Sequence, residues 1–143
     1  EFKETLSLDL RKKTKEKYIE TSALKTVVAF LNSDGGTLLV GVNDAEKIVG
    51  VNVELKKFHK DNLDNFLKHF KNNLKSRIGE AFYPFIDYRI SDVEAHKVLV
   101  VECEQSRSPC SLDGSEFYVR TNPATDKREG PKCREYVKHR SGD

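Results

Sequence analysis

The chain has 143 residues, of which 37% are hydrophobic and 34% are charged, and its formal net charge at pH 7 is only +2. A chain of this length forms one domain with one core, and its content of large apolar residues excludes a disordered protein. The sequence therefore predicts a single ordered domain with a heavily charged surface. We expect it to be a fragment of a longer protein whose earlier residues lie upstream of Glu1.

Some of the basic residues cluster in two runs. One covers residues 11–17. The other consists of Lys127, Lys132 and the further cations Arg128, Arg134, Lys138 and Arg140. Such runs are either solvated surface or sites that neutralise phosphates, in which case the affinity falls steeply with salt. Two of them around one fold favour a nucleic-acid partner.

The first elements are a strand end, a loop and a helix. Residues 1–4 resemble the tail of a strand, whereas residues 5–18 are polar and basic without a clear period, which indicates a loop or a frayed element. Apolar residues at helical spacing predict a helix over residues 20–32. We expect Thr21 or Ser22 to cap its start.

Two adjacent glycines, Gly35 and Gly36, end this helix and lead into a buried strand at residues 37–42, with its hairpin partner at residues 47–51. The pair has two interpretations. It makes a tight turn from helix to strand, or its exposed amides cradle a phosphate. No GxxxxGK[ST] motif is present in the sequence, so we expect neither a P-loop nor ATP as a cofactor.

The second half of the chain predicts a helix over residues 61–78 and strands at residues 86–92, 96–104 and 117–120. A short basic helix at residues 131–140 closes the chain. The expected fold is α+β: one compact domain with a mixed or antiparallel sheet and two to three helices.

No two of the possible zinc ligands lie close together in the sequence; these ligands are His96, Cys103, Cys110 and Cys133. A structural zinc site shows at least one closely spaced pair, so we expect no zinc. Cys103 follows an apolar run and is predicted to lie in the core. Without a signal peptide or a long apolar stretch, the sequence indicates a cytoplasmic protein with reduced thiols and no membrane partner.

Three segments form a distinctive set. They are Glu-Phe-Lys at residues 1–3, AFLNSDGGTLLVGVND at residues 29–44 with IVGV at 48–51, and EFYVR at residues 116–120, which follows SPC at 108–110. Together they resemble the AlbA_2 domain of Schlafen proteins and of many prokaryotic regulators. The resemblance implies binding of DNA or RNA.

In the Schlafen ribonucleases, the resemblance further implies a site of three carboxylates. Two of them match Glu1 and Asp44, and the third lies five residues before Glu1, outside this chain. Carboxylates that converge on one site suit Mg²⁺ or Mn²⁺ and metal-dependent phosphodiester cleavage. Lys3 lies on the same strand face as Glu1 and could steady a phosphate, while Glu4 is a further ligand candidate on the opposite face. Alternatively, Asp44 is a turn residue and Glu1 a charge at an edge strand.

The best candidates for phosphate contact are cations at and after the last strand: Arg120, Lys127, Arg128 and Lys132. Residues 121–125 form a loop whose hydroxyls and amides suit the same purpose. Tyr118 either stacks on a base or packs in the core.

The sequence leaves three functions open. The first is a nucleic-acid-binding module that contacts mainly the backbone of tRNA or DNA, and the second is a divalent-metal-dependent endoribonuclease for tRNA-like RNA. The third is an interaction scaffold, with a homodimer as one form of it.

Overall fold

The computed structural model describes residues 1–121 and 124–128. The strands are β1 (Phe2–Lys3), β2 (Leu8–Asp9), β3 (Thr14–Lys15), β4 (Gly36–Val40), β5 (Ile86–Val93), β6 (His96–Cys103), β7 (Phe117–Thr121) and β8 (Ala124–Arg128). The helices are α1 (Lys17–Leu31), α2 (Asn52–Phe58) and α3 (Leu63–Asn73), followed by a π-helical turn at Leu74–Ile78 and a 3₁₀ helix at Glu80–Phe85.

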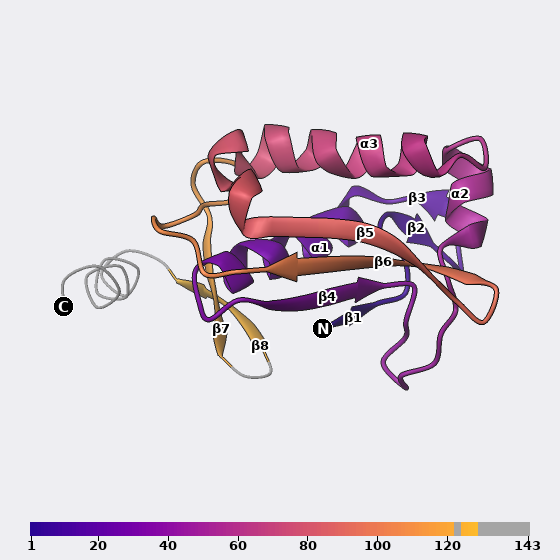
Figure 1. The fold of residues 1–143 in the computed structure, drawn as a ribbon, viewed down its shortest axis with the longest axis horizontal. Coiled ribbons are helices and arrows are strands. Elements are labelled where there is room, and N and C mark those ends of the chain that lie inside the picture. Colours follow the sequence, from indigo (N-terminus) through magenta and orange to yellow (C-terminus); the bar gives the residue numbers. More distant parts are fainter. Residues whose placement is uncertain (122–123, 129–143) are drawn as a thin grey trace.

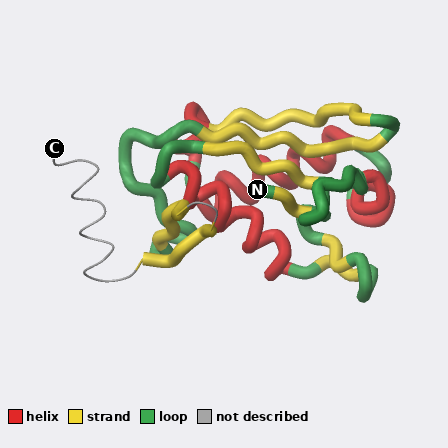
Figure 2. Tube along the Cα trace, turned by 90° about the horizontal axis from the view of Figure 1, so that it is seen from below, coloured by secondary structure: helices red, strands yellow, loops and turns green. Residues whose placement is uncertain are grey.

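A mixed four-stranded sheet with the order β1-β4-β6-β5 is the centre of the fold. Strand β1 is parallel to β4, whereas β4, β6 and β5 are antiparallel neighbours. Helices α1 and α3 lie on one face of this sheet, and the β7–β8 hairpin packs beside α1 (Figures 1 and 2). The predicted α+β class with a mixed sheet is therefore confirmed.

The main core lies between the sheet and the two long helices. Strand β6 turns Leu99 and Val101 toward the helices and Val98 and Val100 toward the opposite face, because successive side chains alternate along a strand. Helix α1 is buried around much of its circumference, since the sheet covers one side of it and β7 another. Cys103 lies in this core, as predicted.

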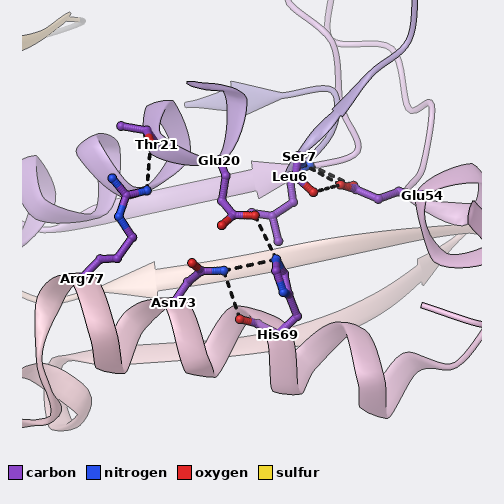
Figure 3. Close-up of polar contacts among 8 residues, drawn as sticks. All are labelled: Leu6, Ser7, Glu20, Thr21, Glu54, His69, Asn73 and Arg77. Carbon is purple, nitrogen blue, oxygen red and sulfur yellow. Dashed lines mark hydrogen bonds and ion pairs between the residues drawn. The ribbon is translucent and has the colours of Figure 1, made fainter. Parts of the chain in front are cut away.

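The first predicted loop and helix need correction. Residues 5–18 contain the β2–β3 hairpin, and α1 begins at Lys17 rather than at residue 20. Thr21 and Ser22 therefore lie inside the helix and do not cap it; the N-cap is Glu16, whose side chain makes no capping hydrogen bond. Both hydroxyls instead accept hydrogen bonds from cations: that of Thr21 from Arg77 (Figure 3), and that of Ser22 from Lys3.

The middle of the chain also differs from the prediction. The segment at residues 47–51 forms only a single bridge, Val42 to Ile48, instead of a hairpin strand. Helix α2 was not predicted because its inward side includes an acid, Glu54, which is 1% exposed. Both oxygens of Glu54 accept hydrogen bonds, from the amides of Leu6 and Ser7 and from the Ser7 hydroxyl (Figure 3).

The predicted helix over residues 61–78 is shorter and irregular, because α3 gives way to the π-helical turn after Asn73. The stretch at residues 121–125 is not one loop, since β7 extends to Thr121 and β8 begins at Ala124. The predicted helix at residues 131–140 lies outside the described residues.

In the part of the chain that the structure describes, no helix is both long and apolar enough to span a membrane.

Candidate nucleic-acid interface

Three charged side chains meet where β1, α1 and β7 come together. Strand β1 pairs with β4 so that Phe2 lies opposite Leu39, on the sheet face away from the helices. The alternation along the strand then places Glu1 and Lys3 together on the other side. Arg120, near the end of β7, reaches the same point.

The contacts among these three residues are direct. One guanidinium nitrogen of Arg120 donates to Glu1 Oε1 at 2.9 Å, and Lys3 Nζ lies 3.2 Å from Glu1 Oε2. The two cations also have contacts of their own: Arg120 donates to Thr125 Oγ1 at 3.1 Å, and Lys3 donates to Ser22 Oγ at 2.8 Å. The guanidinium also lies 5.3 Å from the centre of the Phe30 ring. Both cations are thus held in place from more than one side.

The pKa of Glu1 reflects these neighbours. Partial burial acts to raise it, but hydrogen bonds from Arg120 and Lys3 and their positive charges outweigh burial, so the pKa is lowered. Glu1 is therefore a carboxylate at neutral pH, and it neutralises part of the charge of both cations.

Two hollows adjoin this cluster and share Glu1, Lys3 and Ser22 in their walls. The first, of about 650 Å³, has mostly acidic charges, from Glu1, Glu4, Asp9 and Asp44, against Lys3 and Arg11. The second, of about 590 Å³, has mostly basic charges, from Lys3, Lys25, Arg120 and Lys127, against Glu1 and Glu116. The two hollows therefore present opposite charge on either side of Glu1 and Lys3.

The second hollow has the chemistry that suits a phosphate backbone. In addition to its cations, its wall contains the hydroxyl-bearing residues Ser22, Thr26 and Thr125. The ammonium of Lys25 lies 5.3 Å from the centre of the Tyr118 ring. Tyr118 is 5% exposed and donates its hydroxyl to Glu116 at 3.0 Å, which fits its interpretation as a packing residue.

The structure brings only some of the predicted site residues together. Glu1, Lys3, Arg120 and Lys127 line the second hollow. Arg128 pairs with Phe117 in the β7–β8 ladder but lines neither hollow, and Lys132 lies outside the described residues.

Gly35 and Gly36 lie at the opposite end of β4 from Asp44 and line neither hollow. Gly35 has a φ of +80°, and a Cβ there would come within 2.4 Å of the Cys103 carbonyl oxygen. A Cβ on Gly36 would come within 2.5 Å of the Phe30 ring. Close packing and a positive φ thus account for this pair as a turn from helix to strand.

Three residues of α1 that line the second hollow were missed: Ser22, Lys25 and Thr26. Their spacing of three and four residues places them on one face of a helix. This signal was present in the sequence, since the helix predicted over residues 20–32 contains all three residues, but the sequence did not show that this face of the helix lies beside Lys3 and Arg120.

Asp44 is exposed in a turn that the side chain of Asn43 stabilises by accepting from the amides of Ala45 and Lys47, each at 3.0 Å. Asp44 shares the first hollow with Glu1. Both Glu1 oxygens, however, are engaged by cations, and residues 1–121 and 124–128 contain no group of three or more His, Cys, Asp or Glu side chains placed to hold a metal. The donors as they stand do not fit a divalent cation.

Fold and site together define an α+β domain with a cationic hollow beside its mixed sheet. The family model described as "Schlafen, AlbA_2" matches residues 1–129. The chain belongs to this Schlafen AlbA_2 family, which confirms the resemblance seen in the sequence and supports a role related to nucleic acid. None of the curated proteins matches the chain.

Among solved structures, the chain is similar to the DIP2311 protein from Corynebacterium diphtheriae, with a TM-score of 0.62 and 18% sequence identity. The similarity covers 90% of this chain and 23% of that one. At this identity it supports the fold, and the chain spans under a quarter of the length of that protein.

Proposed function

We propose that this domain binds structured RNA or duplex DNA through the phosphate backbone, with little sequence preference, in the cytoplasm. The observation that carries the proposal is the second hollow, where Lys3, Lys25, Arg120 and Lys127 surround one space. These cations come from β1, α1, β7 and β8, so the fold itself assembles the positive charge. Lysines and arginines that neutralise phosphates release condensed counterions, which drives binding regardless of sequence.

The test compares two double variants with equal loss of charge. Lys25→Ala with Lys127→Ala removes two cations of the hollow, whereas Lys56→Ala with Lys57→Ala removes two exposed lysines of α2 that do not line it. Binding of a fluorescent tRNA-like hairpin and of a DNA duplex is followed by anisotropy across salt concentrations.

We expect the hollow variant to bind both probes roughly tenfold more weakly, with a salt slope smaller by about 2, because each lost phosphate contact lowers it by about 0.9. The α2 variant should stay close to wild type. Equal losses in both variants would contradict the role of the hollow, and wild-type protein that binds neither probe at low salt would contradict the function.

A second candidate function is a divalent-metal-dependent endoribonuclease. The observation in its favour is that Glu1 and Asp44, from distant parts of the sequence, line the same hollow. The nuclease function requires the Glu1 carboxylate to leave Arg120 and Lys3, so a metal must compete with two cations for this carboxylate. Titration with Mn²⁺, followed by electron paramagnetic resonance, distinguishes the two candidates. Stoichiometric binding that Asp44→Asn removes would favour the nuclease, and an unchanged free Mn²⁺ signal would count against it.

A further inference from the structure

The Glu1 carboxylate occupies the place that an anionic ligand would take between Lys3 and Arg120. Its two oxygens contact one cation each, at 3.2 Å and 2.9 Å. A phosphodiester also presents two anionic oxygens, and guanidinium and ammonium groups bind both kinds of anion. The cluster therefore resembles a phosphate site that is already filled by an acid of the chain itself.

We propose that Glu1 is a built-in competitor for phosphate, so that a nucleic-acid backbone binds at Lys3 and Arg120 only by displacing the Glu1 carboxylate. This inference rests on the proposed function of the second hollow and names a regulatory residue within it. It also differs from a role for Glu1 as a metal ligand, because the contacts of Glu1 are with cationic side chains.

The exchange is feasible because the cluster is accessible to solvent. The side chains of Glu1, Lys3 and Arg120 are 21%, 24% and 16% exposed. Ion pairs that water can reach are weak, since both partners regain hydration when they separate. A ligand with several phosphates, which gains further contacts with Lys25 and Lys127, has more interactions with which to compete.

The two cations remain positioned when the carboxylate leaves. Arg120 keeps its hydrogen bond to Thr125 and its contact with the Phe30 ring, and Lys3 keeps its hydrogen bond to Ser22. Glu1 also lines the first hollow, where its carboxylate regains water on leaving the two cations, although the other acids of that hollow oppose the move. A preorganised pair of cations loses little conformational freedom when it binds phosphate.

The consequence is discrimination by the number of phosphates. A single inorganic phosphate gains only the two cations that Glu1 already satisfies, so it binds poorly. A polynucleotide meets Lys25 and Lys127 as well and displaces Glu1. The domain thereby ignores small anions and responds to a continuous backbone.

The experiment compares Glu1→Gln with Glu4→Gln. Both substitutions remove one negative charge from the wall of the first hollow and keep the size of the side chain, but only Glu1 also lines the second hollow. Glu4 is exposed, and no ion pair within the described residues involves it. Binding of the fluorescent RNA hairpin is measured directly and in competition with inorganic phosphate. Glu1→Ala is measured in parallel, with thermal unfolding of every variant as a check on folding.

We expect Glu1→Gln and Glu1→Ala to bind the RNA roughly five- to tenfold more tightly than wild type, because the RNA no longer has to break the two ion pairs of Glu1. Glu4→Gln should gain less than about twofold, because salt screens a charge that makes no direct contact. Inorganic phosphate should compete effectively only against the Glu1 variants.

Equal gains in Glu1→Gln and Glu4→Gln would overturn the inference and leave the proposed function intact, since the effect would then be one of net charge. Weaker binding in folded Glu1 variants would overturn it as well. If folded wild-type protein binds no nucleic acid at low salt, the proposed function fails first, and that outcome is distinct from both.

Discussion

Glu1 and Glu54 are both carboxylates with more than one hydrogen-bond donor, yet their surroundings differ in kind. Glu54 is 1% exposed and accepts from the amides of Leu6 and Ser7 at 2.9 Å and 2.6 Å and from the Ser7 hydroxyl at 2.9 Å. The carboxylate of Glu1 lines both hollows, and its partners among the described residues are the side chains of Lys3 and Arg120, from β1 and β7. Two of the three donors to Glu54 are backbone amides, whereas both donors to Glu1 are side chains.

This difference separates an acid that holds the fold from an acid that can exchange partners. Backbone amides that lose a buried acceptor have no water to replace it, so they keep Glu54 in place. The ammonium and guanidinium groups beside Glu1 can instead donate to phosphate oxygens. Burial and donor type, rather than charge alone, therefore indicate which carboxylate belongs to a binding site.

The largest effect that tests this comparison is the substitution Glu54→Ala. It leaves the amides of Leu6 and Ser7 buried without their acceptor, and we expect it to lower the free energy of unfolding by roughly 2–4 kcal/mol. Glu1→Ala removes two ion pairs that water can reach, and we expect a change below about 1 kcal/mol. Urea unfolding followed by circular dichroism measures both. Similar losses in the two variants would show that Glu1 is as structural as Glu54.

Much of the fold could be predicted because it depends on apolar periodicity. Helix α1 and strands β4, β5 and β6 follow from runs of apolar residues, and their positions were predicted to within a few residues. Helix α2 and strand β8 could not be predicted in this way. The inward side of α2 includes the buried acid Glu54, and β8 (Ala124–Arg128) is mostly polar, so neither shows the expected pattern.

The sequence predicted which residues belong to the candidate site, but it did not predict the contacts among them. Glu1, Lys3 and Arg120 were each named from the sequence, but as parts of two separate sites, a metal site and a phosphate-binding patch. Their contact joins residues 119 positions apart, and it depends on how β7 packs on α1. Only tertiary packing reveals that the predicted metal ligand neutralises the predicted phosphate ligand.

A smaller effect concerns His59, which follows α2, the helix that contains Glu54, and which links pH to stability rather than to binding. His59 at the end of α2 is buried, its ring lies 5.2 Å from that of His69, and its Nε2 has no hydrogen-bond partner among the described residues. Burial lowers the pKa of His59 below the ordinary 6.5, and the charge of His69 and that of Lys15 act in the same direction, while Glu20 opposes them.

The unfolded chain therefore binds a proton at His59 more readily than the folded one. The stability that neutral His59 contributes is present above pH 6.5 and is lost as the pH falls through its lowered pKa. Glu20, which accepts from His69 at 2.9 Å, also makes the folded state less stable as the pH falls, but at a lower pH. Burial acts to raise its pKa, but the hydrogen bond and charge of His69 lower it below 4.5.

His59→Phe tests this link, because an aromatic ring can keep the edge contact with Phe66 at a centroid distance of 5.3 Å. We expect the free energy of unfolding of wild type to fall between pH 7 and pH 5 and that of the variant to fall less, while RNA binding at pH 7 stays unchanged. Urea unfolding at each pH and anisotropy at pH 7 provide the two measurements. Parallel pH profiles for the two proteins would exclude His59 as the titrating group. Altered RNA binding in the folded variant would show that His59 and the second hollow are coupled. That result would contradict the division between residues that hold the fold, such as Glu54, and residues that bind the ligand, such as Glu1.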